Sequence, residues 1–198
     1  MNWHQKTPSV AYLGSRLLAQ GPLETVAIAC KQAAASGSTE ILLVFNEEDY
    51  SQIELDLRGT EQTVLATLPR QTVVDEDVEQ TVKPKGRGRP KLGVVPREVT
   101  LLPRHWEWLR AQPGGASVAL RRLVESARKQ SAPIDQLRRA QNSAYQFISV
   151  MAGAYEGFEE ASRALFAQDM NAFSDYSQEW PEDVRSRARN LAARAMPT

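Results

Sequence analysis

Residues 83–91 read Lys-Pro-Lys-Gly-Arg-Gly-Arg-Pro-Lys, a composition that opposes both helix and strand. Proline lacks the backbone N–H that both elements use, and glycine loses more conformational entropy on ordering than any other residue. An acidic run, Asp75–Glu79, comes shortly before this segment. We therefore interpret residues 73–96 as a flexible linker that divides the chain into an N-terminal and a C-terminal part.

The charges of the chain are segregated along the sequence although they sum to zero. Residues 1–82 carry 5 Lys/Arg against 12 Asp/Glu, residues 83–139 carry 14 against 4, and residues 140–198 carry 5 against 8. The net charges are therefore −7, +10 and −3. A basic block between two acidic ones is typical of a protein in which one region meets a polyanion. The middle segment is the first candidate for contact with nucleic acid.

Cysteine content and hydropathy argue against several classes of protein. Cys30 is the only cysteine, which excludes an internal disulfide and a Cys-rich zinc module. No window approaches the roughly 18 apolar residues of a membrane-spanning helix, and the first residues lack the apolar core of a signal peptide. We expect a cytoplasmic, nucleoid-associated protein with no membrane partner.

Patterns typical of catalysis or metal binding are not visible. The two histidines, His4 and His105, have no spacing that a metal site or a catalytic triad uses. The run Gly114–Ser117 lacks the Gly-Lys-Ser/Thr ending and the preceding apolar strand of a P-loop. We therefore expect no enzyme activity, no metal and no cofactor.

Hydrophobic spacing in residues 1–72 predicts a small ββαββα domain. Its helices follow from apolar residues at helical spacing and from a capping threonine at Thr60. The predicted elements are a hairpin over Val10–Leu18, a helix over Leu23–Ala35, paired strands over Ile41–Phe45 and Ile53–Leu57, and a helix over Thr60–Leu68.

After the linker, residues 97–132 predict a strand-helix-helix unit that ends at Pro133, and residues 133–198 predict an all-α region. The chain as a whole is therefore predicted to be an α+β protein. The predicted elements are a strand over Glu98–Leu102, helices over Pro103–Gln112 and Ser117–Lys129, and further helices that break near Gly157, Gln168-Asp169 and Trp180-Pro181.

The run Arg87-Gly88-Arg89-Pro90 resembles an AT-hook, the minor-groove motif of architectural chromosomal proteins. The resemblance implies that Arg87 and Arg89 insert along the narrow minor groove of A·T-rich DNA, where the negative potential is deepest. Gly88 then allows close approach of the backbone to the groove floor. The remaining predicted contacts of this segment are Lys83, Lys85, Pro90 and Lys91, with Lys85 and Lys91 reaching phosphates.

Residues 97–130 resemble a ribbon-helix-helix domain, in which a strand pairs with its copy in a second chain and enters the major groove. The resemblance implies a homodimer in which Ser117 caps the second helix. The implied DNA contacts are Arg97, Thr100, Ser117, Arg121 and Arg122. The implied dimer core is Leu102, Trp106, Leu109, Leu120, Leu123 and Val124.

The strand departs from the ribbon-helix-helix pattern. Alignment of Pro103 with the start of the first helix places Val99 and Leu101 outward, where they form no hydrogen bonds to bases. Either the register is shifted by one residue, which exposes Glu98 and Thr100, or the unit only dimerises and positions the AT-hook-like run. A helix-turn-helix variant, with residues 117–129 as recognition helix, is the structural alternative.

As a whole the chain resembles a bacterial family catalogued as a domain of unknown function, over most of residues 10–130. These features together predict a DNA-binding protein, a transcriptional regulator or nucleoid-associated factor that prefers A·T-rich DNA. The alternative is an adaptor or antitoxin-like protein whose N-terminal domain or helical tail holds a protein partner, with the basic segment as a tether. The family resemblance rests on Gly21–Leu23, Asp56–Thr60, Gly88–Lys91 and Leu102–Trp106.

Overall fold

The computed structural model describes residues 3–69, 95 and 97–196. The AT-hook-like run 87–90 and its flanking lysines lie outside the described residues. The chain divides into two compact units, of which the first comprises Met1–Thr72 with Pro133–Thr198 and the second comprises Val73–Ala132. The sheet-containing N-terminal part and the C-terminal helices thus belong to one unit.

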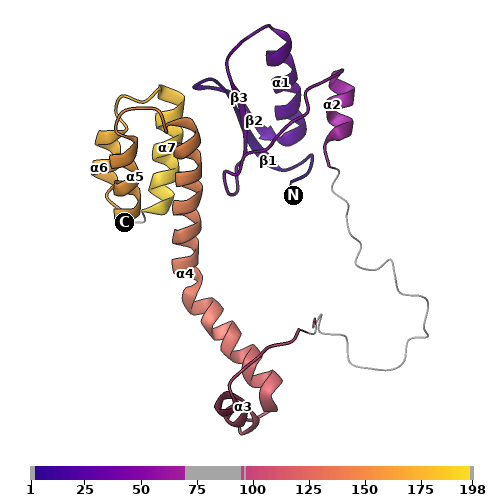
Figure 1. The fold of residues 1–198 in the computed structure, drawn as a ribbon, viewed down its shortest axis with the longest axis vertical. Helices are drawn as coiled ribbons and strands as arrows, with labels where there is room; N and C mark the ends of the chain where they lie inside the picture. Colours follow the sequence, from indigo (N-terminus) through magenta and orange to yellow (C-terminus); the bar gives the residue numbers. More distant parts are fainter. Residues whose placement is uncertain (1–2, 70–94, 96, 197–198) are drawn as a thin grey trace, which may run out of the picture. The chain divides into compact units, whose positions relative to one another are not determined.

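The first unit contains a three-stranded antiparallel sheet with strand order β2-β1-β3 (Figure 1). β1 (Pro8–Leu13) and β2 (Arg16–Pro22) form the predicted hairpin, and β3 (Leu42–Asn46) pairs with β1 on its other side. Gly14 begins the turn with φ of 58°, a left-handed conformation that glycine adopts without a Cβ clash. The sequence therefore predicted all three strands.

Two helices accompany this sheet, and both match their predicted positions. α1 spans Leu23–Ala35, and α2 spans Glu61–Thr67. The hydroxyl of Thr60 accepts a hydrogen bond from the backbone N–H of Thr63, which satisfies one of the unpaired donors at the start of α2.

The predicted fourth strand over residues 53–57 is wrong. Only a bridge between Phe45 and Gln52 and the hydrogen bond from Ile53 N–H to the Val44 carbonyl connect this segment to β3. Beyond Ile53 the chain follows α1 instead, because Leu57 packs against the core beneath α1 and its carbonyl accepts a hydrogen bond from Lys31 Nζ at 2.8 Å. The element order of this part is ββαβα.

The sheet is covered on both faces. Along β1, Val10 and Tyr12 belong to one core cluster and Ala11 to another, as the alternation of side chains in a strand requires. The second cluster is formed with α1 and α2, and the first with the C-terminal helices. Burial on both faces explains why the sequences of β1 and β3 are continuous apolar runs and do not alternate between apolar and polar residues.

The C-terminal part of the chain is helical, as predicted, and its breaks fall at the expected residues. α5 begins after Gly157 and ends at Gln168, and α7 begins after Pro181. The helices are α4 (Gly115–Met151), α5 (Phe158–Ala167), α6 (Met170–Tyr176) and α7 (Glu182–Ala195).

Pro133 does not end its helix, in contrast to the prediction. α4 includes Pro133 and continues to Met151. A proline inside a helix removes one backbone hydrogen bond and costs about 3 kcal/mol. The continuation is stabilised by burial of Ala144, Phe147 and Ile148 in the first core cluster.

The second unit contains α3 (Pro103–Arg110) and the first half of α4. Two details differ from the sequence-based expectation. No strand is present over residues 97–102, because no described segment of the chain forms a ladder with them. Ser117 lies inside the first turn of α4 and does not cap it, because the turn through Gly114 lets the helix begin at Gly115.

Candidate nucleic-acid interface

The described part of the basic segment carries its cations on the surface. Residues 97–132 contain seven Lys/Arg against three Asp/Glu, and all seven cationic side chains are exposed. Exposed cations of one predominant sign create the positive potential that attracts a polyanion. The seven are Arg97, Arg104, Arg110, Arg121, Arg122, Arg128 and Lys129.

Four of these cations share one side of α4. Arg121 and Arg128 are seven residues apart, and so are Arg122 and Lys129. Seven residues correspond to about two turns and on the order of 10 Å along the helix axis. Each pair therefore points in nearly the same direction, and the four side chains form a cationic strip of adjacent rows.

One carboxylate, that of Glu125, lies within this strip. Arg128 donates to it twice, from Nε at 3.1 Å and from Nη2 at 2.8 Å, and Lys129 Nζ lies 3.9 Å from it. The hydrogen bond from Arg128 holds the pKa of Glu125 below its ordinary value. Glu125 therefore neutralises part of the charge at the C-terminal end of the strip.

Arg121 and Arg122 differ from Arg128 in this respect. The Nε of Arg121 donates to the Ser117 carbonyl at 3.1 Å, and this neutral acceptor orients the guanidinium without neutralising its charge. Within residues 3–69, 95 and 97–196, neither Arg121 nor Arg122 forms a salt bridge. Both guanidinium groups are available for phosphate oxygens, which arginine binds in a bidentate manner.

The remaining predicted contacts are less well assembled. Arg97 and Thr100 are exposed in a segment without regular secondary structure, and Ser117 is exposed in the first turn of α4. Lys83, Lys85 and the run 87–91 lie outside the part of the chain that the structure describes. The structure thus brings together Arg121 and Arg122 with two further cations, Arg128 and Lys129, that the sequence analysis did not select.

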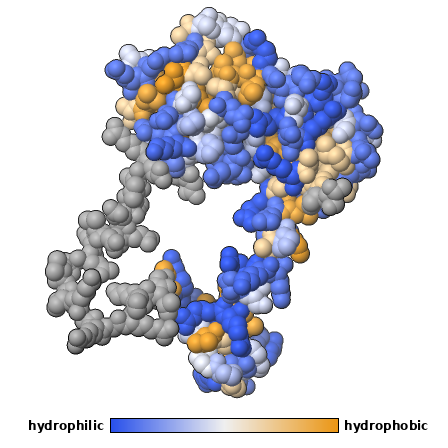
Figure 2. Space-filling view, turned by 180° about the vertical axis from the view of Figure 1, so that it is seen from behind, coloured by the Kyte–Doolittle hydropathy of each residue, from blue (hydrophilic) through white to orange (hydrophobic). Residues whose placement is uncertain are grey.

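The predicted dimer core separates into two groups in the single chain. Leu109 is buried, and Trp106 and Leu120 are partly buried. Leu102, Leu123 and Val124 are exposed, and Figure 2 shows apolar residues interrupting the hydrophilic surface of this unit. The exposed group is available for contact with another molecule.

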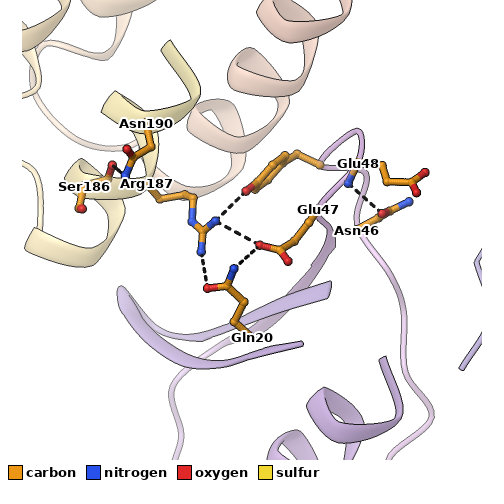
Figure 3. A network of polar contacts seen from close by, with 8 residues as sticks. Gln20, Asn46, Glu47, Glu48, Ser186, Arg187 and Asn190 are labelled. Atoms are coloured by element: carbon orange, nitrogen blue, oxygen red, sulfur yellow. Dashed lines mark hydrogen bonds and ion pairs between the residues drawn. The ribbon is translucent and has the colours of Figure 1, made fainter. Parts of the chain in front are cut away.

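Sequence reasoning missed a polar network around Arg187 in the first unit. Its guanidinium donates to Glu47 at 3.2 Å, to the Tyr50 hydroxyl at 3.1 Å and to Gln20 at 3.0 Å (Figure 3). Gln20 in turn donates to Glu47 at 2.7 Å. Burial raises the pKa of Tyr50, and the positive charge of Arg187 opposes that shift. The network connects α7 to the sheet, and no sequence motif signals it, because its members are far apart in the chain.

Arg139, the last cation of the basic segment, lines a pocket of about 230 Å³ in the first unit. Glu47, Glu48 and Arg194 also line it. Carboxylates and guanidinium groups of equal number offset one another there, so the pocket does not select a ligand of one charge.

Two further observations concern the described residues. Among residues 3–69, 95 and 97–196, no three His, Cys, Asp or Glu side chains are grouped as a metal ion requires. None of the helices in this part of the chain combines the length and the apolar character that crossing a membrane demands.

Fold and surface together define an α+β protein with a three-stranded antiparallel sheet, mostly helical elements and an exposed cationic strip on α4. The chain belongs to the family described as uncharacterized protein conserved in bacteria (DUF2239), whose model matches residues 8–192. The resemblance to a bacterial family of unknown function is thereby confirmed. Searches of curated proteins and of solved structures find no match.

Proposed function

We propose that this protein binds DNA through residues 83–139, as a transcriptional regulator or nucleoid-associated factor of the cytoplasm and without enzymatic activity. The observation that carries the proposal is the cationic strip on α4, in which Arg121 and Arg122 are exposed and unpaired among the described residues. Such a strip suits the DNA backbone, because each phosphate neutralised by Lys or Arg releases condensed counterions.

The AT-hook-like run adds a second contact to the proposal. Arg87 and Arg89 would enter the minor groove of A·T-rich DNA while the α4 strip holds phosphates. Phosphate contacts position a protein and carry no direct sequence information. Preference for A·T-rich duplexes therefore depends on Arg87 and Arg89, and overall affinity depends on both groups.

For the second unit we propose the ribbon-helix-helix layout, in which residues 98–102 pair with their copy in a second chain. The exposure of Thr100 and of the apolar side chains of Leu102, Leu123 and Val124 supports this layout. The helix-turn-helix layout, with the first half of α4 in the major groove, is the alternative. It would place Arg121 and Arg122 near the start of a recognition helix.

A fluorescence-anisotropy titration with A·T-rich and G·C-rich duplexes of equal length tests the proposal. We expect the wild type to prefer the A·T-rich duplex, Arg87→Ala/Arg89→Ala to lose that preference, and Arg121→Ala/Arg122→Ala to lose affinity for both. Arg16→Ala/Arg58→Ala is the matched control, because it removes two exposed arginines from the acidic N-terminal part. Equal binding by all four proteins would overturn the proposal.

The adaptor alternative has its own signature in a co-purification experiment. If nuclease treatment leaves a stoichiometric protein partner bound and no variant or wild-type sample retains nucleic acid, the basic segment acts as a tether. The protein partner would then bind through the N-terminal part or the helical tail.

A further inference from the structure

One side of α4 follows a heptad repeat. Ala116, Leu120, Leu123, Ala127 and Gln130 succeed one another at intervals of four and three residues, the spacing of a and d positions in a coiled coil. In the sequence the same register continues through Ile134 and Leu137 to Ala144, Ile148 and Met151, and these last three are buried in the core of the first unit.

None of the charged residues in this part of the helix occupies an a or d position. The positions that flank a and d, called e and g, are occupied from residue 117 to residue 133 by Ser, Ala, Val and Pro. Charge is confined to the outward positions b, c and f. The charged residues between 117 and 135 are Arg121, Arg122, Glu125, Arg128, Lys129 and Asp135.

The apolar seam, defined here as Leu120, Leu123, Val124 and Ala127, is largely uncovered in the single chain. Leu123 is 45% exposed, Val124 is 63% exposed, and Ala127 is also exposed. An apolar seam that is exposed and has no charged residues along its edges is suited to packing against another helix.

The described residues of the second unit, 95 and 97–132, form no hydrophobic core of their own. Among its described residues, Leu109 and Ala119 are the only buried hydrophobic side chains. Neither core cluster contains a described residue of this unit. A small domain that buries so little apolar surface usually needs a metal, a disulfide or oligomerisation to be stable. The only cysteine lies elsewhere, at Cys30, and no described side chains form a metal site.

We propose that the apolar seam is the contact between two copies of this chain, which pair along the first half of α4. This inference rests on the proposed function and deepens it, because it assigns the contact between the two copies to the first half of α4, where DNA is proposed to bind. An identical helix fits for two reasons: uncharged e and g positions avoid like-charge repulsion between copies, and the seam is self-complementary. Gln130, the one polar residue at a d position in this stretch, restricts the register of the pair.

The pairing also determines where the charges lie. Because Arg121, Arg122, Arg128 and Lys129 occupy b and c positions, pairing along a and d leaves the cationic strips of both chains on the outer surface. The dimer therefore presents two strips to one duplex. The seam differs from the ribbon-helix-helix core of the sequence analysis, since it lies on α4 alone and excludes Leu102, Trp106 and Leu109, of which the single chain already buries Leu109.

Light scattering coupled to size exclusion, on the full chain over a range of loading concentrations, tests the proposal. We expect the wild type to have twice the 22.1 kDa mass of one chain, and Leu123→Glu to have the mass of one chain. Val118→Glu is the matched control, because Val118 has the same 45% exposure as Leu123 but occupies an outward f position. It should remain a dimer.

Ala127→Glu provides a second variant at an exposed seam position, so that misfolding of Leu123→Glu does not decide the test. Far-ultraviolet circular dichroism verifies that each variant keeps its helix content. A monomeric wild type, or folded Leu123→Glu and Ala127→Glu variants that are both still dimers, would overturn the seam contact.

Anisotropy measurements on the same samples separate this proposal from the DNA proposal. A wild-type dimer that binds no duplex, together with a monomeric Leu123→Glu variant, overturns DNA binding and supports the seam. A wild-type monomer that binds a duplex overturns the seam and supports DNA binding. If both proposals hold, Leu123→Glu loses affinity relative to Val118→Glu, because a single strip contacts fewer phosphates.

Discussion

Arg187 on α7 donates a hydrogen bond of 3.2 Å to the carboxylate of Glu47, which lies 140 residues earlier in the chain and directly after β3. The side chains of Arg187 and Glu47 are 17% and 20% exposed, so water screens this ion pair only weakly. The pair therefore joins the C-terminal helices to the sheet at a specific point.

Arg187→Met should lower the free energy of unfolding by about 1 to 3 kcal/mol, because the Glu47 carboxylate and the Tyr50 hydroxyl lose their shared donor. Urea denaturation followed by circular dichroism measures this loss. Arg163→Met is the matched control, since Arg163 pairs with Glu160 on an exposed helix surface and such pairs contribute at most about 1 kcal/mol. Equal midpoints for both variants would contradict the structural role of Arg187.

Phe147→Ala should destabilise the sheet and the C-terminal helices together. The Phe147 ring on α4 contacts Tyr12, Phe45 and Tyr50, with ring centroids 5.5 to 5.7 Å apart. Truncation of a buried phenylalanine costs about 3 to 5 kcal/mol. Tyr145→Ala, at an exposed position of the same helix, is the control. Denaturation followed by both aromatic and far-ultraviolet signals should show one shifted transition, and two separate transitions would contradict a shared core.

Gly157→Ala and Gly37→Ala form a matched pair of substitutions. Both glycines have φ of 79°, but a Cβ at Gly157 would overlap the carbonyl oxygen of Tyr176, whereas nothing lies within 4 Å of one at Gly37. The left-handed conformation alone costs alanine about 1 kcal/mol. Gly37→Ala should lose about that amount and Gly157→Ala distinctly more, as measured from thermal or urea unfolding.

Cys30 should react slowly with thiol reagents in the native protein at pH 8. Burial raises the pKa of its thiol from 9.0 to about 12, and the thiolate is the reactive species. Reaction with a colorimetric disulfide reagent should become fast and complete in denaturant. Gln32→Cys, at an exposed position of α1, should add one fast-reacting thiol to the native protein. Rapid reaction of native Cys30 would contradict its burial.

Arg121→Ala/Arg122→Ala should reduce the salt dependence of DNA binding as well as the affinity. Each phosphate contact contributes about 0.9 to the slope of log K against log salt concentration. The double variant should therefore lower the magnitude of this slope by about 1.8 if both arginines contact phosphates. An unchanged slope would show that neither residue does so.

The strands and helices of residues 8–68 followed from local signals. Apolar residues at helical spacing located α1, and the capping hydroxyl of Thr60 located the start of α2. The segment 53–57 alternates as a strand does, yet beyond the hydrogen bond from Ile53 to Val44 it forms no ladder with β3. Its apolar side chains Ile53, Leu55 and Leu57 pack in the core cluster that α1 and α2 form. Alternation specifies which side chains are buried and does not specify the partner.

The candidate site was predictable to the extent that it depends on the distribution of charged residues along the sequence. The excess of cations in residues 83–139 is a property of the sequence, and so are the positions of Arg121 and Arg122 on one predicted helix. The sequence did not predict which cations are neutralised by a carboxylate. Glu125 binds Arg128 through a side-chain geometry that sequence spacing alone does not specify. The continuity of α4 through Pro133 was missed for a related reason, since packing of residues far along the chain stabilises it.

The sequence by itself determined most of the local elements, the segregation of charge and the family of this protein. Only the tertiary structure decided that the C-terminal helices cover the second face of the N-terminal sheet. The physical reason is that hydrophobic burial is non-directional: an apolar strand requires cover on both faces, but its sequence does not encode which distant segment supplies it.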